Sequence, residues 1–279
     1  MLGLVLTVPA SEAELASDAL WALGVAAIEE RGGESGTEDD LVELWTSLGD
    51  DAHAVARAAE GFPARWRWKV IELDPSVTET WRAHAHASWI EKDLVVVPAW
   101  LPFEDPPGTT VVRIEPGATF GLGDHPTTVL CLRALRAALP PGGSVLDVGS
   151  GSGVLAVTAG VLGAGRITGI DISPATPAVA AANAEANGVG ERVEVTTTPL
   201  ADVDRTFDVV LANLLAPTLL ALADDLVRVV GPDGALVISG LLADRHEHVV
   251  AALAPLHPVE RRTKEGWTAI TLRADAPHR

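Results

Sequence analysis

The sequence predicts an α/β fold, in which a doubly wound, seven-stranded sheet ends in an antiparallel hairpin and follows a small α+β domain. From residue 125 onward, apolar strands alternate with helices, which is typical of a parallel sheet covered on both faces. The last two strands, near 257–263 and 267–273, are joined by a short KEG turn and therefore form a hairpin. Residues 1–73 follow another order: strand, helix, strand, strand, helix, strand.

The first region begins with an apolar, β-branched run at 2–8 that predicts a strand. Ser11, followed three residues later by Glu14, predicts the capped start of a helix. Strands are expected at 26–30, 41–47 and 65–73, with a second helix at about 50–61. This order is the split βαβ pattern of a ferredoxin-like domain, which alone does not indicate what the domain binds.

Residues 74–92 predict a linker helix between this domain and the second domain, 93–279. His84 and His86 lie in that helix, but a spacing of two places them on different faces, so we expect no metal pair there and no metal site. The segments LVVVPAW and TVVRIEP then predict strands on either side of a Pro-rich turn.

The second domain continues with a regular alternation of elements. Helices are expected at 125–139, 153–163, 174–187, 216–230 and 243–253. Strands before the hairpin are expected at 144–149, 166–172, 193–198, 207–214 and 235–240.

Composition excludes several classes of protein. The net charge of −18 argues against salt-driven binding to nucleic acid, which needs a basic face. The single cysteine, Cys131, excludes an internal disulfide framework and lies in an apolar helical pattern that predicts a buried packing role. The sequence shows neither a basic leader nor the roughly 18 uncharged apolar residues of a membrane span. We expect a soluble, cytoplasmic monomer that binds no nucleic acid directly.

The segment VLDVGSGSGVLA runs from a predicted strand through a glycine-rich turn into a helix. Gly149, Gly151 and Gly153 let the backbone bend tightly and approach a ligand without an intervening side chain. Asp147, just before them, is a candidate to hold the loop or to accept a hydrogen bond from an ammonium group. The alternative is a glycine turn that only joins strand to helix.

Asp171 ends the next strand, where a carboxylate can accept hydrogen bonds from both hydroxyls of a ribose. It could instead cap the following helix, and a nicotinamide cofactor could share it. The alternating glycines lack the spacing of the dinucleotide fingerprint, since Val154 stands at its last position. Together with the C-terminal hairpin, the topology expected of class I methyltransferases, they favour S-adenosyl-L-methionine, which carries no phosphate.

Asn213 lies at the end of the strand at 207–214, at the edge of the sheet where such folds bind ligands. Its carbonyl, with a neighbouring backbone oxygen, can hold the hydrogens of an amine so that the lone pair is aimed at a methyl group. Asn213 is thus the candidate catalytic residue, with helix capping as the alternative. The loop at 117–128 is glycine-rich and could close over a cofactor. Asp124 and His125 in it are candidate proton acceptors, although helix capping is the expected role of both.

The motifs FGLGDHPTT, LDVGSGSGVLA, GIDISP, ANLLAP and SGLL, in this order and spacing, resemble the bacterial methyltransferases of large-subunit ribosomal protein eleven. The resemblance extends over nearly the whole chain, including WRAHAHASW and GWTAITLR. It implies that Thr128, Gly149, Asp171 and Asn213 contact the methyl donor. It also implies that the N-terminal domain captures the ribosomal protein and presents its lysine side chains and N-terminal amine.

The sequence departs from the family pattern at Leu122, where Thr is usual, and at Asp124, where Thr or His is frequent. Three alternatives remain open at this point: a methyltransferase of the same fold acting on another protein lysine or a small amine, a nicotinamide-dependent oxidoreductase, and a non-catalytic scaffold.

Overall fold

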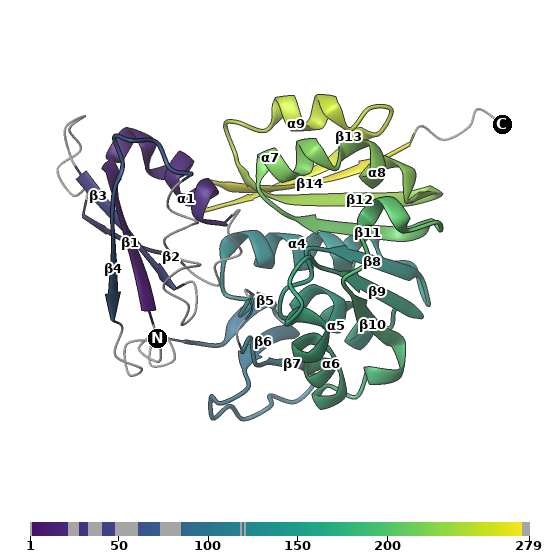
Figure 1. Cartoon of the computed structure of the whole chain (residues 1–279). Helices are drawn as coiled ribbons and strands as arrows, with labels where there is room; N and C mark the ends of the chain where they lie inside the picture. The colour runs from purple at the N-terminus through teal and green to yellow at the C-terminus, as the bar shows by residue number, and fades with distance from the viewer. Residues whose placement is uncertain are drawn as a thin grey trace. The chain divides into compact units, whose positions relative to one another are not determined.

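The computed structural model describes residues 2–21, 28–32, 41–47, 61–72, 85–117, 119 and 121–274. The chain divides into two compact units, residues 1–85 and 86–279 (Figure 1). The helix predicted at 50–61, the linker up to residue 84 and His84 lie outside the described residues. Within the described ranges, every helix is too short or too polar to cross a bilayer.

Unit 1 contains a four-stranded antiparallel sheet in the order β2-β3-β1-β4. Its elements are β1 (Leu2–Pro9), η1 (Ala10–Glu12), α1 (Ala13–Trp21), β2 (Ile28–Gly32), β3 (Leu41–Ser47) and β4 (Arg67–Glu72). Alternate residues of β1, among them Leu4 and Leu6, are buried in one cluster with Ala16 and Leu20 of α1. The strand order agrees with a split βαβ pattern, but the second helix lies outside the described residues, so the ferredoxin-like assignment stays a prediction.

The first helix of unit 1 starts differently from the prediction. Pro9 precedes a short 3-10 turn that contains Ser11, and α1 begins only at Ala13. Ser11 is therefore inside the helical turn instead of before it, and the predicted capping position is wrong. Pro9, whose ring fixes φ, introduces the turn two residues earlier.

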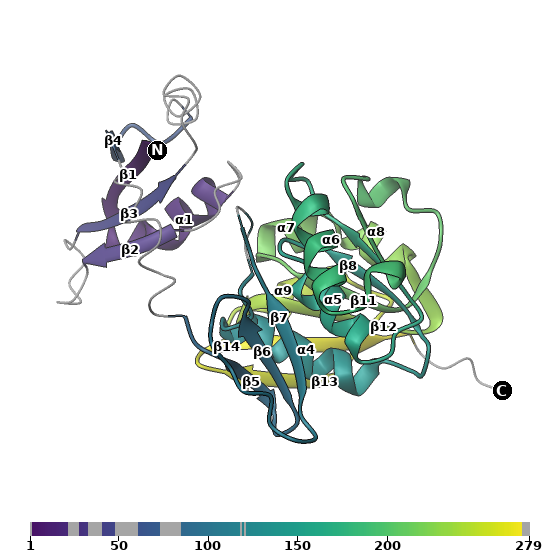
Figure 2. The ribbon, with the colours of Figure 1, turned by 90° about the horizontal axis from the view of Figure 1, so that it is seen from below.

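Unit 2 begins with a three-stranded sheet of β5 (Ser88–Glu91), β6 (Leu94–Pro98) and β7 (Thr110–Ile114). The prediction of a helix through residue 92 is wrong at this point, because Ser88–Glu91 forms a strand that pairs with β6. Burial alternates along it, with Ser88 and Ile90 buried and Trp89 exposed, which is the period of a strand. This sheet packs against α4 and α5, as Figure 2 shows from below.

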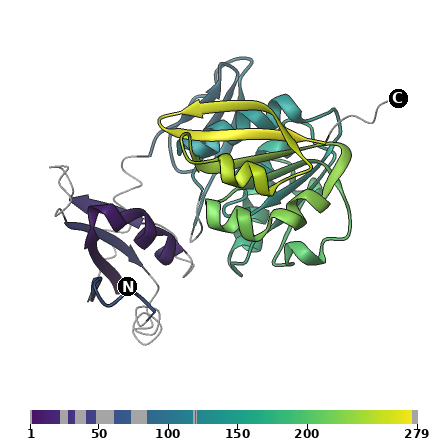
Figure 3. The same cartoon turned by 90° about the horizontal axis from the view of Figure 1, so that it is seen from above.

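The main sheet of unit 2 has seven strands in the order β10-β9-β8-β11-β12-β14-β13. They are β8 (Ser144–Val148), β9 (Arg166–Ile170), β10 (Val193–Thr196), β11 (Phe207–Asn213), β12 (Val230–Leu242), β13 (His257–Lys264) and β14 (Trp267–Arg273). The first five in the order are parallel, whereas β14 is antiparallel to both neighbours (Figure 3). The φ values of 51° at Glu265 and 81° at Gly266 suit the tight turn between β13 and β14. The predicted doubly wound sheet with a closing hairpin is confirmed.

Helices cover both faces of this sheet. They are α4 (Pro126–Ala138), α5 (Val154–Val161), α6 (Thr176–Ala186), α7 (Ala216–Ala221), α8 (Ala223–Arg228) and α9 (Glu247–Ala252), with 3-10 turns η3 (Gly190–Arg192) and η4 (Leu200–Asp202). One apolar cluster joins α4, α5 and α6 to the sheet, and a second joins α7, α8 and α9 to it. Cys131 is fully buried in the first cluster, as predicted, and burial raises the pKa of its thiol.

Two predicted helices of unit 2 have different bounds. The helix expected at 216–230 is interrupted at Leu222, which separates α7 from α8. The helix expected at 243–253 begins only at Glu247, because β12 continues to Leu242 and pairs with β14 beyond an irregularity after Ile238. Helix α6 tolerates Pro177 because it lies in the first turn, where no intrahelical donor is lost.

Candidate active site

The glycine turn between β8 and α5 depends on backbone conformations that only glycine adopts readily. Gly149, Gly151 and Gly153 have φ of 75°, 54° and 80°. A Cβ on Gly153 would lie 2.8 Å from the Cβ of the fully buried Ala180, so the turn also packs closely against α6. The turn therefore presents its backbone without side chains, as the sequence predicted.

Three neighbouring strands bring the candidate residues to one level of the sheet. Val148 of β8 pairs with Ile170 of β9 on one side and with Ala212 of β11 on the other. The residues that directly follow these three are Gly149, Asp171 and Asn213. Because adjacent strands lie about 4.8 Å apart, the backbones of the three residues lie within about 10 Å of one another. The structure thus gathers the candidates at the carboxyl edge of the sheet.

Asp171 orders the backbone around it. Its Oδ2 accepts a hydrogen bond from the Gly151 amide at 2.8 Å, and its Oδ1 accepts one from the Ser173 amide at 2.8 Å. The N-cap of α6 is Ala175, so Asp171 does not cap that helix. Each carboxylate oxygen can accept a second hydrogen bond, which leaves capacity for hydroxyl donors.

Asp147 lies fully buried beneath the glycine turn. Its Oδ2 accepts hydrogen bonds from the Ser150 hydroxyl at 2.8 Å and from the Ala156 amide at 3.2 Å. Its Oδ1 has no partner among the described residues. Burial raises the pKa of this carboxyl to about 7, since the charged form loses its hydration. Of the two roles considered for Asp147, the contacts support the one of holding the loop.

Asn213 meets Thr128 across the site. The Asn213 Nδ2 lies 3.5 Å from the Thr128 Oγ1, which is a long hydrogen bond between the end of β11 and the first turn of α4. The N-cap of α7 is Leu215, with no capping bond from a side chain, so Asn213 does not cap that helix. The carbonyl oxygen is the hydrogen-bond acceptor of the Asn213 side chain, and its amide nitrogen carries a second hydrogen besides the one directed at Thr128.

The loop that leads to α4 is fastened at both ends. The Ser152 hydroxyl of the glycine turn donates a hydrogen bond to the Gly121 carbonyl. His125 is the N-cap of α4, since its Nδ1 accepts a hydrogen bond from the Thr127 amide at 3.3 Å, and burial lowers the pKa of its imidazole. The expected capping role of His125 is confirmed.

Two features of the site escaped the sequence analysis. Ile172, directly after Asp171, is 92% exposed, which is unusual for a large apolar side chain and provides an apolar surface beside the carboxylate. An apolar residue after a strand-ending aspartate was visible in the sequence, but its exposure was not. The second feature is Asn183 of α6, whose contacts depend on tertiary packing that no local pattern reveals.

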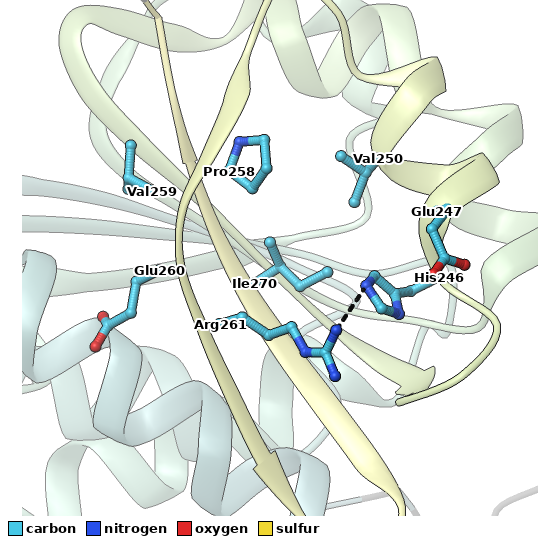
Figure 4. A pocket seen from close by; sticks show the side chains of 8 residues that line it. All are labelled: His246, Glu247, Val250, Pro258, Val259, Glu260, Arg261 and Ile270. Atoms are coloured by element: carbon cyan, nitrogen blue, oxygen red, sulfur yellow. Dashed lines mark hydrogen bonds between the residues drawn. The ribbon is translucent and has the colours of Figure 1, made fainter.

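A pocket of about 420 Å³ lies elsewhere in unit 2, between α9 and the hairpin of β13 and β14 (Figure 4). Arg261 and His246 approach each other on its wall, with 3.4 Å between Nη1 and Nε2. Val250 and Ile270 supply apolar lining. None of the predicted cofactor residues lines this pocket, and it is not part of the candidate active site.

Comparison with known proteins identifies the family. The family model described as ribosomal protein L11 methyltransferase (PrmA) matches residues 35–275. The chain belongs to this family. The ribosomal protein L11 methyltransferase of Geobacter metallireducens is 45% identical over 196 residues, covering 70% of this chain and 64% of that protein. The one of Symbiobacterium thermophilum is 39% identical over 236 residues, covering 84% and 75%.

A solved structure of the same family supports the fold. The ribosomal protein L11 methylase from Lactobacillus delbrueckii subsp. bulgaricus is 31% identical, with a TM-score of 0.63, and the match covers 68% of this chain and 98% of that one. The sheet described above is therefore the class I methyltransferase fold. The chain spans about two thirds of the length of the first curated relatives of the L11 methyltransferase family that it matches.

Proposed function

We propose that this chain is an S-adenosyl-L-methionine-dependent N-methyltransferase that methylates lysine side chains and the N-terminal amine of large-subunit ribosomal protein L11. The observation that carries the proposal is the alignment of Gly149, Asp171 and Asn213 at one level of three adjacent strands, with Thr128 beside Asn213. Ligands of open α/β sheets bind at this edge.

The residues present fit the methyl donor. The backbone of the turn at Gly149, Gly151 and Gly153 leaves room for close approach, Asp171 retains capacity for ribose hydroxyls, and Ile172 offers an apolar surface to the adenine ring. When bound, the donor supplies an electrophilic methyl group on a sulfonium. A dinucleotide cofactor carries a pyrophosphate, and the fingerprint that binds it has a different glycine spacing from the alternating glycines of this turn. The methyl donor carries no phosphate.

The protein's own contribution is to position the amine. The Oδ1 of Asn213, with a neighbouring backbone carbonyl, accepts the amine hydrogens and so fixes the direction of the lone pair. The hydrogen bond from Asn213 Nδ2 to Thr128 fixes the orientation of the amide. The amine must be neutral to react, and a site that excludes water lowers the pKa of an ammonium group.

The substrate assignment follows from the names of the relatives and from the presence of unit 1. Methyltransferases of this family are named for a ribosomal protein. A separate unit of 85 residues is suited to capture of a macromolecule, whereas a small amine needs no such unit. Unit 1 is accordingly proposed to bind the ribosomal protein and to present its amino groups.

Mass spectrometry of the purified ribosomal protein, after incubation with the enzyme and an isotopically labelled methyl donor, tests the proposal. We expect labelled methyl groups on lysines and on the N-terminal amine. Removal of unit 1 should abolish this methylation while binding of S-adenosylhomocysteine by calorimetry persists. An unmodified ribosomal protein, together with methylation of another protein or small amine, would instead support a methyltransferase of the same fold with that other substrate. Binding of NADH and not of S-adenosylhomocysteine would refute both.

A further inference from the structure

Two asparagines, Asn183 of α6 and the C-cap residue Asn187, bind the edge of β7 and of the residue that follows it through their side-chain amides. The Asn183 Oδ1 accepts a hydrogen bond from the Glu115 amide at 2.9 Å, and its Nδ2 donates to the Glu115 carbonyl at 2.9 Å. Asn187 does the same to Arg113, with distances of 2.9 Å and 2.7 Å. Each side chain therefore takes the place that a residue of a neighbouring strand would have.

The spacing explains why this arrangement works. Residues four apart on a helix are separated by about 6 Å along its axis, and residues two apart on a strand by about 6.7 Å. Alternate residues of a strand direct their amide and carbonyl groups to the same side. The spacing of Asn183 and Asn187 thus matches that of Arg113 and Glu115. The two asparagines cover the edge of β7 opposite to β6, which is the only strand that pairs with β7 in the described part of the chain.

The two asparagines differ in the second hydrogen of their side-chain amide. Asn187 donates it to the Asn183 carbonyl of its own helix at 2.7 Å. Asn183 donates it to the carbonyl of Ser152 in the glycine turn, at 2.8 Å. The Ser152 hydroxyl continues the connection to Gly121 in the loop before α4. Asn183 is 4% exposed, so water cannot readily replace these bonds.

We infer that Asn183 is a positioning residue for the methyl-donor site: it fastens the glycine turn, at Ser152, and the segment after β7, at Glu115, to α6, the helix that follows Asp171. This inference rests on the proposed function, since it requires the donor to bind at the glycine turn. The hydrogen bond from Asn183 reaches the glycine turn at the backbone carbonyl of Ser152, which is not itself one of the residues assigned to the donor. Its effect is to hold three segments at fixed separations: the glycine turn, the loop before α4, and the segment from Asp171 into α6. The site is therefore formed before the ligand arrives.

The matched variants Asn183→Ala and Asn187→Ala test the inference, because both remove one acceptor and two donors and both loosen the edge of β7. Only Asn183→Ala also frees the glycine turn. We expect Asn183→Ala to weaken the binding of S-adenosylhomocysteine about tenfold in calorimetry, and Asn187→Ala to change it by less than about twofold. In steady-state assays, Asn183→Ala should raise the KM for the methyl donor while kcat at saturation changes by less than about threefold.

Urea unfolding of both variants shows that they are folded under the binding conditions. If Asn183→Ala does not fold, the pair Asn183→Asp and Asn187→Asp, which preserves side-chain volume and the acceptor oxygen, gives the same comparison. Equal affinities for S-adenosylhomocysteine in the two variants of a pair would overturn the inference. Asp171→Ala, measured beside them, separates failure of the proposed function from failure of the inference. If Asp171→Ala binds S-adenosylhomocysteine as tightly as the wild type does, the proposed donor site is wrong and the inference fails with it. If it binds weakly while the asparagine pair is equal, only the inference fails.

Discussion

The side-chain amide nitrogen of Asn213 lies 3.5 Å from the hydroxyl oxygen of Thr128, although 85 residues separate the two in the sequence. Thr128 is buried in the first turn of α4, and Asn213 ends β11. The contact uses the amide nitrogen of Asn213, and its carbonyl oxygen is the acceptor that we propose for an incoming amine. In this proposal Thr128 orients the amide and Asn213 accepts the amine hydrogens.

Asn213→Ala removes the carbonyl that is proposed to aim the amine. We expect kcat to fall about 100-fold, because misplacement of a reacting group by about 1 Å costs roughly that factor. Affinity for S-adenosylhomocysteine should change far less. Steady-state methylation of the ribosomal protein gives kcat. In the same assay Thr128→Val, which removes the hydroxyl beside the Asn213 amide but keeps the Asn213 carbonyl, should lower kcat less. A kcat within a few-fold of wild type in Asn213→Ala would remove it from the mechanism.

Asp171→Ala should weaken cofactor binding by about 1–3 kcal/mol, because charge-assisted hydrogen bonds to the ribose are lost. Asp208→Ala is a matched control, since Asp208 also accepts a backbone amide, that of Ser144 at 2.7 Å, but near the opposite ends of the strands. Titration of both variants with S-adenosylhomocysteine compares them. Comparable weakening in both would show that general loss of stability, and not the ribose contact, explains the effect.

Gly153→Ala should destabilise unit 2 more than Gly163→Ala. Both glycines have strongly positive φ, 80° and 95°, so each substitution costs about 1–2 kcal/mol of backbone strain. A Cβ at Gly153 would also lie 2.8 Å from Ala180, whereas one at Gly163 meets nothing within 4 Å. The additional cost of overpacking is about 1–3 kcal/mol. Free energies of unfolding in urea provide the comparison, and equal losses in the two variants would contradict the close packing of the turn on α6.

The buried carboxyl of Asp147 should make stability depend on pH near neutrality. Burial raises its pKa to about 7 from the ordinary 3.8, so the folded chain binds more protons than the unfolded chain between these values. The free energy of unfolding should therefore decrease as the pH rises from about 4 to about 7. Asp147→Asn, which is neutral throughout, should lack this component, and the wild-type minus variant difference isolates it. The wild-type minus Asp208→Asn difference should instead increase with pH, at pH values below about 4, since hydrogen bonds from Ser144 lower the pKa of Asp208 from its ordinary 3.8. A flat difference for Asp147 would refute the prediction.

The sequence was sufficient to predict those parts of the fold and of the site that local chemistry determines. The glycine turn, Asp171 and Asn213 were located correctly because each lies at the carboxyl end of an apolar strand, and parallel strands bring these ends to one edge. The hairpin followed from the turn at Glu265 and Gly266. Whether these residues bind the methyl donor stays a prediction for the titrations above.

Tertiary packing explains what the sequence analysis missed. Ser88–Glu91 has residues compatible with a helix, but β6 needs a partner strand, and this pairing outweighs the local preference. The connection from Asn183 to Ser152 and Glu115 joins residues 31 and 68 positions apart, which no periodicity can indicate. The break at Leu222 likewise divides a helix that the apolar pattern alone predicts as continuous.

The order of strands in the main sheet has a consequence for synthesis on the ribosome. Strand β13 emerges before β14, yet β14 lies between β12 and β13. Until Trp267–Arg273 has been made, β12 keeps an open edge, and β13 has no place in the sheet. An open strand edge is a template for pairing with other chains. Products that terminate before Trp267 should therefore aggregate, because the last strand to be translated is the one that closes the sheet.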